Sequence, residues 1–168
     1  MRIYMAGGLF TVAEKMFNRA LAAGLRARGH EVWLPQEHQY DSPEDTFQGC
    51  LAGVDWCEVV AANMDGSDPD SGTAAECGIA YHSQPVRSVL AYRTDFRAGG
   101  ESETGAGYNL MLWGIASARL DLSYVHVLTD PIPAIVEAID LALSQMPGCS
   151  RSVSGSSMSV PSAILVNS

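Results

Sequence analysis

The segment DGSDPDSGTAAECGIAY, residues 65–81, is a loop with three carboxylates that turns into a helix. Small residues at positions 71–73 allow a sharp turn, and Ser71 or Thr73 can cap the helix that follows. Glu76 falls in the first or second turn of that helix, where the helix dipole favours an ionised carboxylate. Spacing alone leaves two interpretations open: a nucleophilic glutamate at the edge of a sheet, or an acidic turn before a surface helix.

Strand and helix signals alternate on both sides of this segment, which is typical of a parallel sheet covered by helices. Thr11 with Glu14, and Ser42 with Pro43, mark two helix starts. We expect strands at residues 2–6, 31–34, 59–62, 86–92 and 124–128. We expect helices at 11–29, 42–54, 71–84, 109–118 and 130–143, and a long Gly-rich loop at 93–108 that is a candidate lid.

This order predicts an α/β fold, a flavodoxin-like five-stranded parallel sheet with helices on both faces. Residues 1–147 form the expected domain, and residues 148–168 a Ser-rich C-terminal tail. In such sheets ligands bind beyond the carboxyl ends of the strands. Gly7 and Asp65 each follow a strand at that edge, so we expect both to flank the substrate crevice.

Composition excludes several classes of partner. The chain has 168 residues and a net charge of -9, which argues against nucleic acid and anionic membranes but not against an uncharged nucleoside. The four cysteines lack a C-x-x-C pair, and the four histidines lack metal-ligand spacing. We expect no metal and no cofactor. The first apolar run is too short for a signal peptide, so we expect a cytoplasmic protein with reduced thiols.

Three segments resemble the nucleoside 2-deoxyribosyltransferase family, in the family's order. They are IYMAGGLFT at 3–11, DSGTAAECGIAY at 70–81 and NLMLWG at 109–114, and GHEVWLP at 29–35 also fits. The resemblance covers roughly residues 1–145. It implies a transferase that exchanges the base of a 2-deoxyribonucleoside, through a covalent sugar–glutamate intermediate and with retained configuration.

The resemblance also implies roles for catalytic residues. Glu76 matches the nucleophile, and Tyr4 matches the tyrosine whose hydroxyl contacts that nucleophile and keeps it ionised. Asp70 matches the residue that holds the sugar and its 5-hydroxyl. Ordinary structural roles remain open for Asp70, as a turn aspartate, and for Tyr4, as a core tyrosine.

Further positions match substrate-contacting residues. Phe10 would form an apolar wall for the base, and Gln39 would contact the base edge through its amide. Asn109 and Met111 resemble residues that reach into a neighbouring subunit's site, which implies a homo-oligomer. Helix-entry packing for Phe10, a solvated loop for Gln39 and a core position for Met111 are the structural alternatives.

Cys50 departs from the family pattern, because the family usually has an aspartate there that handles the base and its proton. Cysteine is a poor acid–base substitute unless its pKa is tuned. Glu44, Asp45 or Asp55 could compensate, although helical spacing puts Asp55 off that face. Cys50 therefore leaves base preference and exchange itself open.

Two other functions remain. A hydrolase of the same fold would cleave a nucleoside or nucleoside monophosphate to sugar and free base. A non-enzymatic nucleotide-binding module would hold phosphate at the Gly7–Gly8 loop, although the loop lacks a P-loop lysine and its surroundings are acidic.

Overall fold

The computed structural model describes residues 1–97 and 107–146, and its centre is a five-stranded parallel sheet. The strand order is β2-β1-β3-β4-β5, which confirms the expected flavodoxin-like arrangement. The strands are β1 (Arg2–Ala6), β2 (Glu31–Trp33), β3 (Val59–Asn63), β4 (Ser88–Arg93) and β5 (Ala118–Asp121). The candidate lid lies partly, and the Ser-rich tail wholly, outside the described residues.

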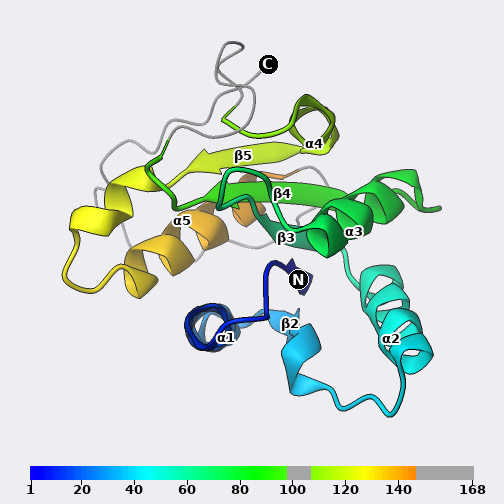
Figure 1. The fold of residues 1–168 in the computed structure, drawn as a ribbon. Coiled ribbons are helices and arrows are strands. Elements are labelled where there is room, and N and C mark those ends of the chain that lie inside the picture. Colours follow the sequence, from blue (N-terminus) through cyan, green and yellow to red (C-terminus); the bar gives the residue numbers. More distant parts are fainter. Residues whose placement is uncertain (98–106, 147–168) are drawn as a thin grey trace.

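Helices cover both faces of this sheet (Figure 1). They are α1 (Val12–Ala27), α2 (Pro43–Trp56), α3 (Ser71–His82), α4 (Leu110–Ile115) and α5 (Ile132–Gln145), with short 3-10 helices at Pro35–Glu37 and Ser123–Val127. One core lies between the sheet and α1 with α5, and the other between the sheet and α2, α3 and α4.

Alternation along β1 decides which side chains enter which core. Ile3 and Met5 belong to the α1–α5 core, whereas Tyr4 and Ala6 belong to the α2–α3 core. Successive side chains on a strand point to opposite faces, so this register follows from the period of two. Tyr4 therefore points to the face that carries the acidic loop's helix.

Local capping signals place the first two long helices as expected. Thr11 and Glu14 form a complete capping box at α1, and Ser42 caps α2 with Pro43 at its first position. The cap of α3 differs from the expectation: Asp70 is the N-cap, and its side chain accepts from the Thr73 amide. An aspartate can fill this role as well as serine or threonine can.

The expected fifth strand at 124–128 is wrong, because Ser123–Val127 forms a 3-10 helix. The strand lies earlier, at Ala118–Asp121. Its first residue, Ala118, was expected to be the last residue of a helix at 109–118. Helix α4 ends at Ile115, and the Asp121 side chain accepts from the Ser123 amide and closes the strand with a turn. Val127 is 73% exposed, so the apolar letters of this run did not indicate burial.

Candidate active site

Tyr4 and Glu76 meet inside the α2–α3 core. The Tyr4 hydroxyl donates a hydrogen bond of 2.6 Å to Oε1 of Glu76, although 72 positions separate the two residues. Tyr4 is fully buried on β1, and Glu76 is half-buried in the second turn of α3. The expected contact between phenol and carboxylate is therefore present.

Cys50, on α2, is the third member of this cluster. Its half-buried thiol interacts with both the Tyr4 hydroxyl and the Glu76 carboxylate. Burial raises the pKa of the Cys50 thiol, and the Glu76 charge adds to the rise, while the hydrogen bond with Tyr4 opposes it. The thiol therefore stays protonated at neutral pH.

Glu76 itself differs from the expected behaviour. Burial raises its pKa, and the nearby charge of Asp70 adds to that rise. Hydrogen bonds from Tyr4 and Cys50 lower the pKa but do not cancel the effect of burial. Burial in a poorly solvated site is the largest influence on the pKa of Glu76, and it opposes the ionised form that a position near the start of α3 was expected to favour.

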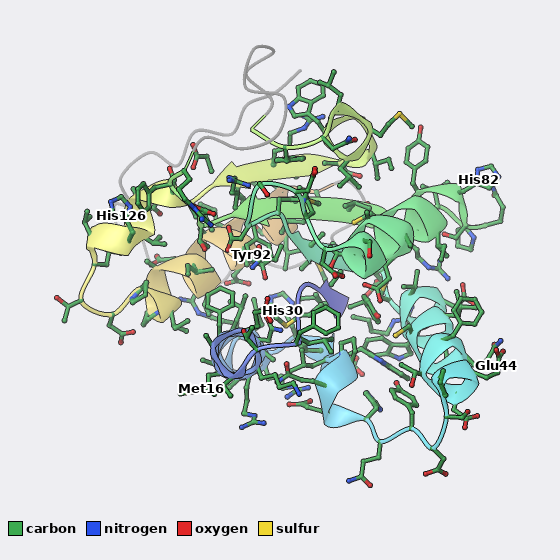
Figure 2. All side chains as sticks on the ribbon, viewed as in Figure 1. Met16, His30, Glu44, His82, Tyr92 and His126 are labelled. Atoms are coloured by element: carbon green, nitrogen blue, oxygen red, sulfur yellow. The ribbon has the colours of Figure 1, made fainter. Side chains whose placement is uncertain are left out.

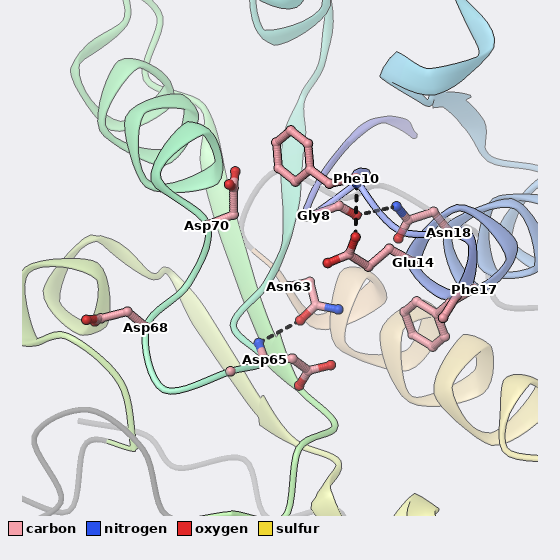
Figure 3. A pocket seen from close by; sticks show the side chains of 11 residues that line it. Gly8, Phe10, Glu14, Phe17, Asn18, Asn63, Asp65, Asp68 and Asp70 are labelled. Carbon is pink, nitrogen blue, oxygen red and sulfur yellow. Dashed lines mark hydrogen bonds between the residues drawn. The ribbon is translucent and has the colours of Figure 1, made fainter.

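Asp70 lines an open cavity, and its charge also acts on Glu76. Its Oδ2 accepts from the Thr73 amide at 3.0 Å and so caps α3, which leaves the structural alternative in place alongside a sugar-binding role. The adjoining cavity has a volume of about 460 Å³ (Figure 3). The residues that line it are Gly8, Phe10, Ala13, Glu14, Phe17, Asn18, Asn63, Asp65, Gly66, Asp68 and Asp70. Tyr4, Cys50 and Glu76 are not among them.

The Gly7–Gly8 loop already holds a carboxylate. Oε2 of Glu14 accepts from the amides of Phe10 and Thr11 at 2.9 and 2.7 Å, at the start of α1. A side chain on Gly7 would approach Cβ of Asn63 to 3.3 Å, so this loop passes close to the end of β3. Glu14 thus occupies two amides at the start of α1, and its charge opposes a phosphate there.

Asp65 and Phe10 occupy different parts of the cavity. Asp65 accepts from the Thr94 amide and hydroxyl, each at 2.6 Å, and from the Asp95 amide at 2.8 Å, so it ties the acidic loop to the segment after β4. Phe10 is 76% exposed and stands at the cavity wall (Figure 3). Of these two, Phe10 has the freer surface for a ligand.

The residue after Gln39 is the one that packs toward the cluster. Gln39 is exposed, whereas the ring of Tyr40 lies against Gly49, next to Cys50. Gly53 lies on α2, the helix that also carries Gly49 and Cys50. A Cβ on Gly53 would lie 2.7 Å from Nε1 of Trp33 and 2.7 Å from the ring of Tyr4. Sequence reasoning missed Tyr40 and Trp33; the two glycines around Cys50 were the available signal.

Met111 lies on α4, at the edge of the α2–α3 core, and Asn109 immediately precedes this helix. Oδ1 of Asn109 accepts from the Met111 amide at 2.9 Å and caps this short helix. Met111 is 75% exposed, so it is not a core methionine. Both residues reach the surface. Their contact with the site of a neighbouring subunit stays a prediction, because the structure contains a single chain.

Metal ligands do not gather in the part of the chain that the structure describes. Among residues 1–97 and 107–146, no three His, Cys, Asp or Glu side chains could hold a metal ion. Three of the four histidines, His30, His82 and His126, are far apart in Figure 2. None of the described helices combines the length and the apolar character needed to cross a bilayer.

Comparison with known proteins agrees with this fold. Residues 3–111 match the model of the nucleoside 2-deoxyribosyltransferase family. The 2-deoxyribosyltransferase of Bacillus psychrosaccharolyticus is similar, at 23% identity and a TM-score of 0.57, over 81% of this chain and 96% of that one. The sequence matches none of the curated proteins.

Two further solved structures are similar. The 2-deoxyribosyltransferase of Leishmania mexicana shares 19% identity with a TM-score of 0.59, over 85% of this chain and 97% of that one. The CMP N-glycosidase of Clostridium botulinum shares 16% identity with a TM-score of 0.55, over 84% and 99%. At these identities the likeness establishes the fold.

Proposed function

Because the chain belongs to the nucleoside 2-deoxyribosyltransferase family, we propose that it exchanges the nucleobase of a 2-deoxyribonucleoside with Glu76 as the nucleophile. The observation that carries this proposal is the 2.6 Å hydrogen bond from Tyr4 to Oε1 of Glu76. It orients the carboxylate, whose other oxygen would attack the anomeric carbon. No arginine or lysine pairs with Glu76 within the described residues.

The chemistry follows the retaining glycosidase pattern. Cleavage of the C1′–N bond develops positive charge on the sugar, which a carboxylate beneath the ring stabilises and then captures as an ester. A 2-deoxy sugar lacks the electron-withdrawing 2-hydroxyl, so its cation forms more easily. A second base then attacks C1′ from the vacated face, and the two inversions give retention.

The residues around the cavity supply the proposed binding site. Asp70 would hold the sugar 5-hydroxyl, with Gly7 and Asp65 shaping the loops on either side. Phe10 would form the apolar wall, and Gln39 would reach the base edge if its exposed loop closes. The acidic lining supports an uncharged 5-hydroxyl rather than a phosphate, since carboxylates repel phosphate.

Assembly would complete the site. Asn109 and the exposed Met111 would extend into the neighbouring subunit's cavity and exclude water, which competes with the acceptor base. The proposed enzyme is a cytoplasmic homo-oligomer of nucleoside salvage. The free thiols of Cys50, Cys57 and Cys77 fit a reducing compartment.

Hydrolysis is the second candidate, and Cys50 is the observation that favours it. A neutral thiol assists a base poorly, so water could replace the acceptor base once the sugar ester forms. The fold is also that of a CMP N-glycosidase. A phosphate-binding module without activity is less favoured, because the Glu14 carboxylate occupies the amides of Phe10 and Thr11 beside the Gly7–Gly8 loop and would repel a phosphate.

Incubation with 2′-deoxyinosine and adenine separates these functions. Formation of 2′-deoxyadenosine indicates transfer, and release of hypoxanthine alone indicates hydrolysis. A slow 2-fluoro-2-deoxy nucleoside should leave a sugar adduct on Glu76, detectable by mass spectrometry.

Glu76→Gln should abolish the adduct and should lower the turnover rate by about a thousandfold or more. The matched control is Glu58→Gln, since Glu58 precedes β3 at the opposite edge of the sheet and pairs with Arg2. Full activity in Glu76→Gln would contradict the proposal.

A further inference from the structure

Asn18 is the only polar side chain among the four buried residues of α1. It is 6% exposed, yet it lines the cavity together with Glu14 and Phe17 from the same helix (Figure 3). Buried polar side chains normally have their hydrogen-bonding groups satisfied. The partners of the two ends of this amide therefore show whether it keeps a free group for a ligand.

A chain of hydrogen bonds fixes the orientation of the Asn18 amide. Nε2 of Gln36 donates to the backbone oxygen of Lys15 at 2.8 Å, so Oε1 of Gln36 is the atom left to accept. Nδ2 of Asn18 donates to this Oε1 at 3.4 Å and to the backbone oxygen of Gly8 at 3.0 Å. Both hydrogens of the Asn18 nitrogen are therefore used within the protein, and Oδ1 is the group that remains.

Oδ1 of Asn18 accepts no hydrogen bond from any residue that the structure describes. It lies 3.9 Å from the position that a Cβ on Gly7 would occupy, beside the loop that follows β1. In Figure 3 this oxygen is turned away from the bond to Gly8. A buried acceptor that lacks a donor costs free energy, so a ligand group that donates a hydrogen bond there would be stabilised.

Asp70 presents a second free acceptor to the same cavity. Its Oδ2 accepts from the Thr73 amide at 3.0 Å and from the Thr73 hydroxyl at 3.4 Å, whereas its Oδ1 has no donor among residues 1–97 and 107–146. The cavity thus offers one acceptor from α1 and one from the start of α3. A complementary ligand carries two separate hydrogen-bond donors and no negative charge.

The sugar of a 2-deoxyribonucleoside has two donors of this kind. Its 3-hydroxyl is carried by C3′ and its 5-hydroxyl, through C5′, by C4′, and these are the two ring atoms that are not bonded to C1′. Both hydroxyls therefore suit a space beside the nucleophile, and the cavity is not lined by Tyr4, Cys50 or Glu76. The proposed function assigns the 5-hydroxyl to Asp70 and leaves the 3-hydroxyl without a partner.

We propose that Oδ1 of Asn18 accepts a hydrogen bond from the 3-hydroxyl of the substrate, so that Asn18 selects nucleosides in which this hydroxyl is free. The inference rests on the proposed function, because it takes the position of the sugar from Glu76 and Asp70. The bonds of Nδ2 to Gly8 and Gln36 hold the acceptor toward the cavity.

The test uses three donors, 2′-deoxyinosine, 2′,3′-dideoxyinosine and 2′,5′-dideoxyinosine, with the full-length wild type and with Asn18→Ala. The measurement is kcat/KM for hypoxanthine release, which reports both transfer and hydrolysis. Asn18→Ala should lower it about 10- to 100-fold for 2′-deoxyinosine and for the 5′-deoxy donor, because each loses the bond to the 3-hydroxyl. For the 3′-deoxy donor the wild type and Asn18→Ala should agree to within about threefold.

The comparison of donors separates substrate recognition from structure. Asn18→Ala also removes the bonds to Gly8 and Gln36, but a purely structural effect would lower kcat/KM by the same factor for all three donors, and this result would overturn the inference. An effect of Asn18→Ala that disappears only with the 5′-deoxy donor would overturn it as well. The intrinsic reactivity of each donor is the same for both proteins and cancels.

The wild type decides the question if Asn18→Ala does not fold. Relative to the spontaneous rates of the two donors, kcat/KM should fall about 10- to 100-fold from 2′-deoxyinosine to the 3′-deoxy donor. A fall of less than about threefold would overturn the inference.

The outcomes also distinguish this inference from the proposed function. If Glu76→Gln releases hypoxanthine at the wild-type rate, the proposed function fails. If release depends on Glu76 but the effect of Asn18→Ala does not depend on the 3-hydroxyl, only the inference about Asn18 fails.

Discussion

The hydroxyl of Tyr4 lies 2.6 Å from Oε1 of Glu76, so the first strand directly orients a carboxylate on the third long helix. The contact arises because alternation along β1 turns Tyr4 toward α3, and because Gly53 leaves room for the Tyr4 ring. The hydrogen bond lowers the pKa of Glu76, in opposition to burial. The balance between these two effects controls the ionisation of the proposed nucleophile.

Tyr4→Phe should move the acidic limb of the pH–rate profile to higher pH. The Tyr4 hydrogen bond lowers the pKa of Glu76, so its loss raises that pKa and reduces the ionised fraction at mildly acidic pH. A hydrogen bond to a charged group contributes about 1.5–3 kcal/mol. The expected loss in kcat/KM below neutral pH is therefore about 10- to 100-fold, measured on deoxyinosine.

The control for this variant is Tyr92→Phe. Tyr92 is also a buried strand tyrosine, but it belongs to the α1–α5 core. The acidic limb of the pH–rate profile of Tyr92→Phe should coincide with that of the wild type. An equal displacement in Tyr4→Phe and Tyr92→Phe would show that the effect comes from a general loss of packing.

Glu76→Gln should stabilise the fold at neutral and alkaline pH. Burial raises the pKa of Glu76 above its ordinary value of 4.5, so the folded state binds the proton more tightly than the unfolded state. Stability is therefore lost as pH rises from that value through the folded pKa, and the amide avoids this loss. Thermal unfolding should show a gain of about 0.5–2 kcal/mol near pH 8, and little gain near pH 4. A gain that is equal at both pH values would contradict the assignment of this cost to Glu76.

Gly53→Ala should cost both stability and activity. Its Cβ would lie 2.7 Å from Nε1 of Trp33 and from the Tyr4 ring, and overpacking of this kind typically costs about 1–3 kcal/mol. Gly78→Ala is the matched helical control, since nothing lies within 4 Å of its Cβ position. It should stabilise α3 by up to about 1 kcal/mol. Similar unfolding temperatures for the two variants would contradict this packing.

Asp70 variants separate capping from substrate binding. Asp70→Ala removes the cap of α3 and should lose about 0.5–2 kcal/mol, whereas asparagine caps nearly as well. Both variants remove the charge that raises the pKa of Glu76, so both should move the acidic limb to lower pH. If Asp70 binds the sugar, KM should rise about tenfold in Asp70→Asn at unchanged stability. An unchanged KM would leave Asp70 as a cap alone.

Mixing two inactive variants tests whether a neighbouring subunit completes the site. Glu76→Gln and Asn109→Ala would each abolish activity in pure form, but mixed oligomers would contain some sites with both native residues. Activity should return after joint refolding and should scale with the product of the two concentrations. If mass spectrometry shows mixed oligomers but activity does not recover, Asn109 acts in the site of its own chain and the proposed shared site is contradicted.

Much of the architecture was predictable from neighbouring residues. The capping box of Thr11 and Glu14 marks the start of α1, and the order of strands and helices predicts the parallel sheet. These signals are local, because they depend on residues within one helical turn or one strand. The fifth strand was missed because its position depends on pairing with β4, through Leu90 opposite Ala118, which no local pattern reports.

The proposed chemistry divides in the same way. The resemblance of short sequence segments to a known family was enough to single out Glu76, Tyr4 and Cys50, whereas spacing alone left the role of Glu76 open. Only the folded packing showed that burial raises the pKa of Glu76, that Tyr40 rather than Gln39 adjoins Cys50, and that Asp70 caps α3. Burial and electrostatic interaction depend on distances between segments far apart in the chain, and these distances exist only once the helices have packed on the sheet.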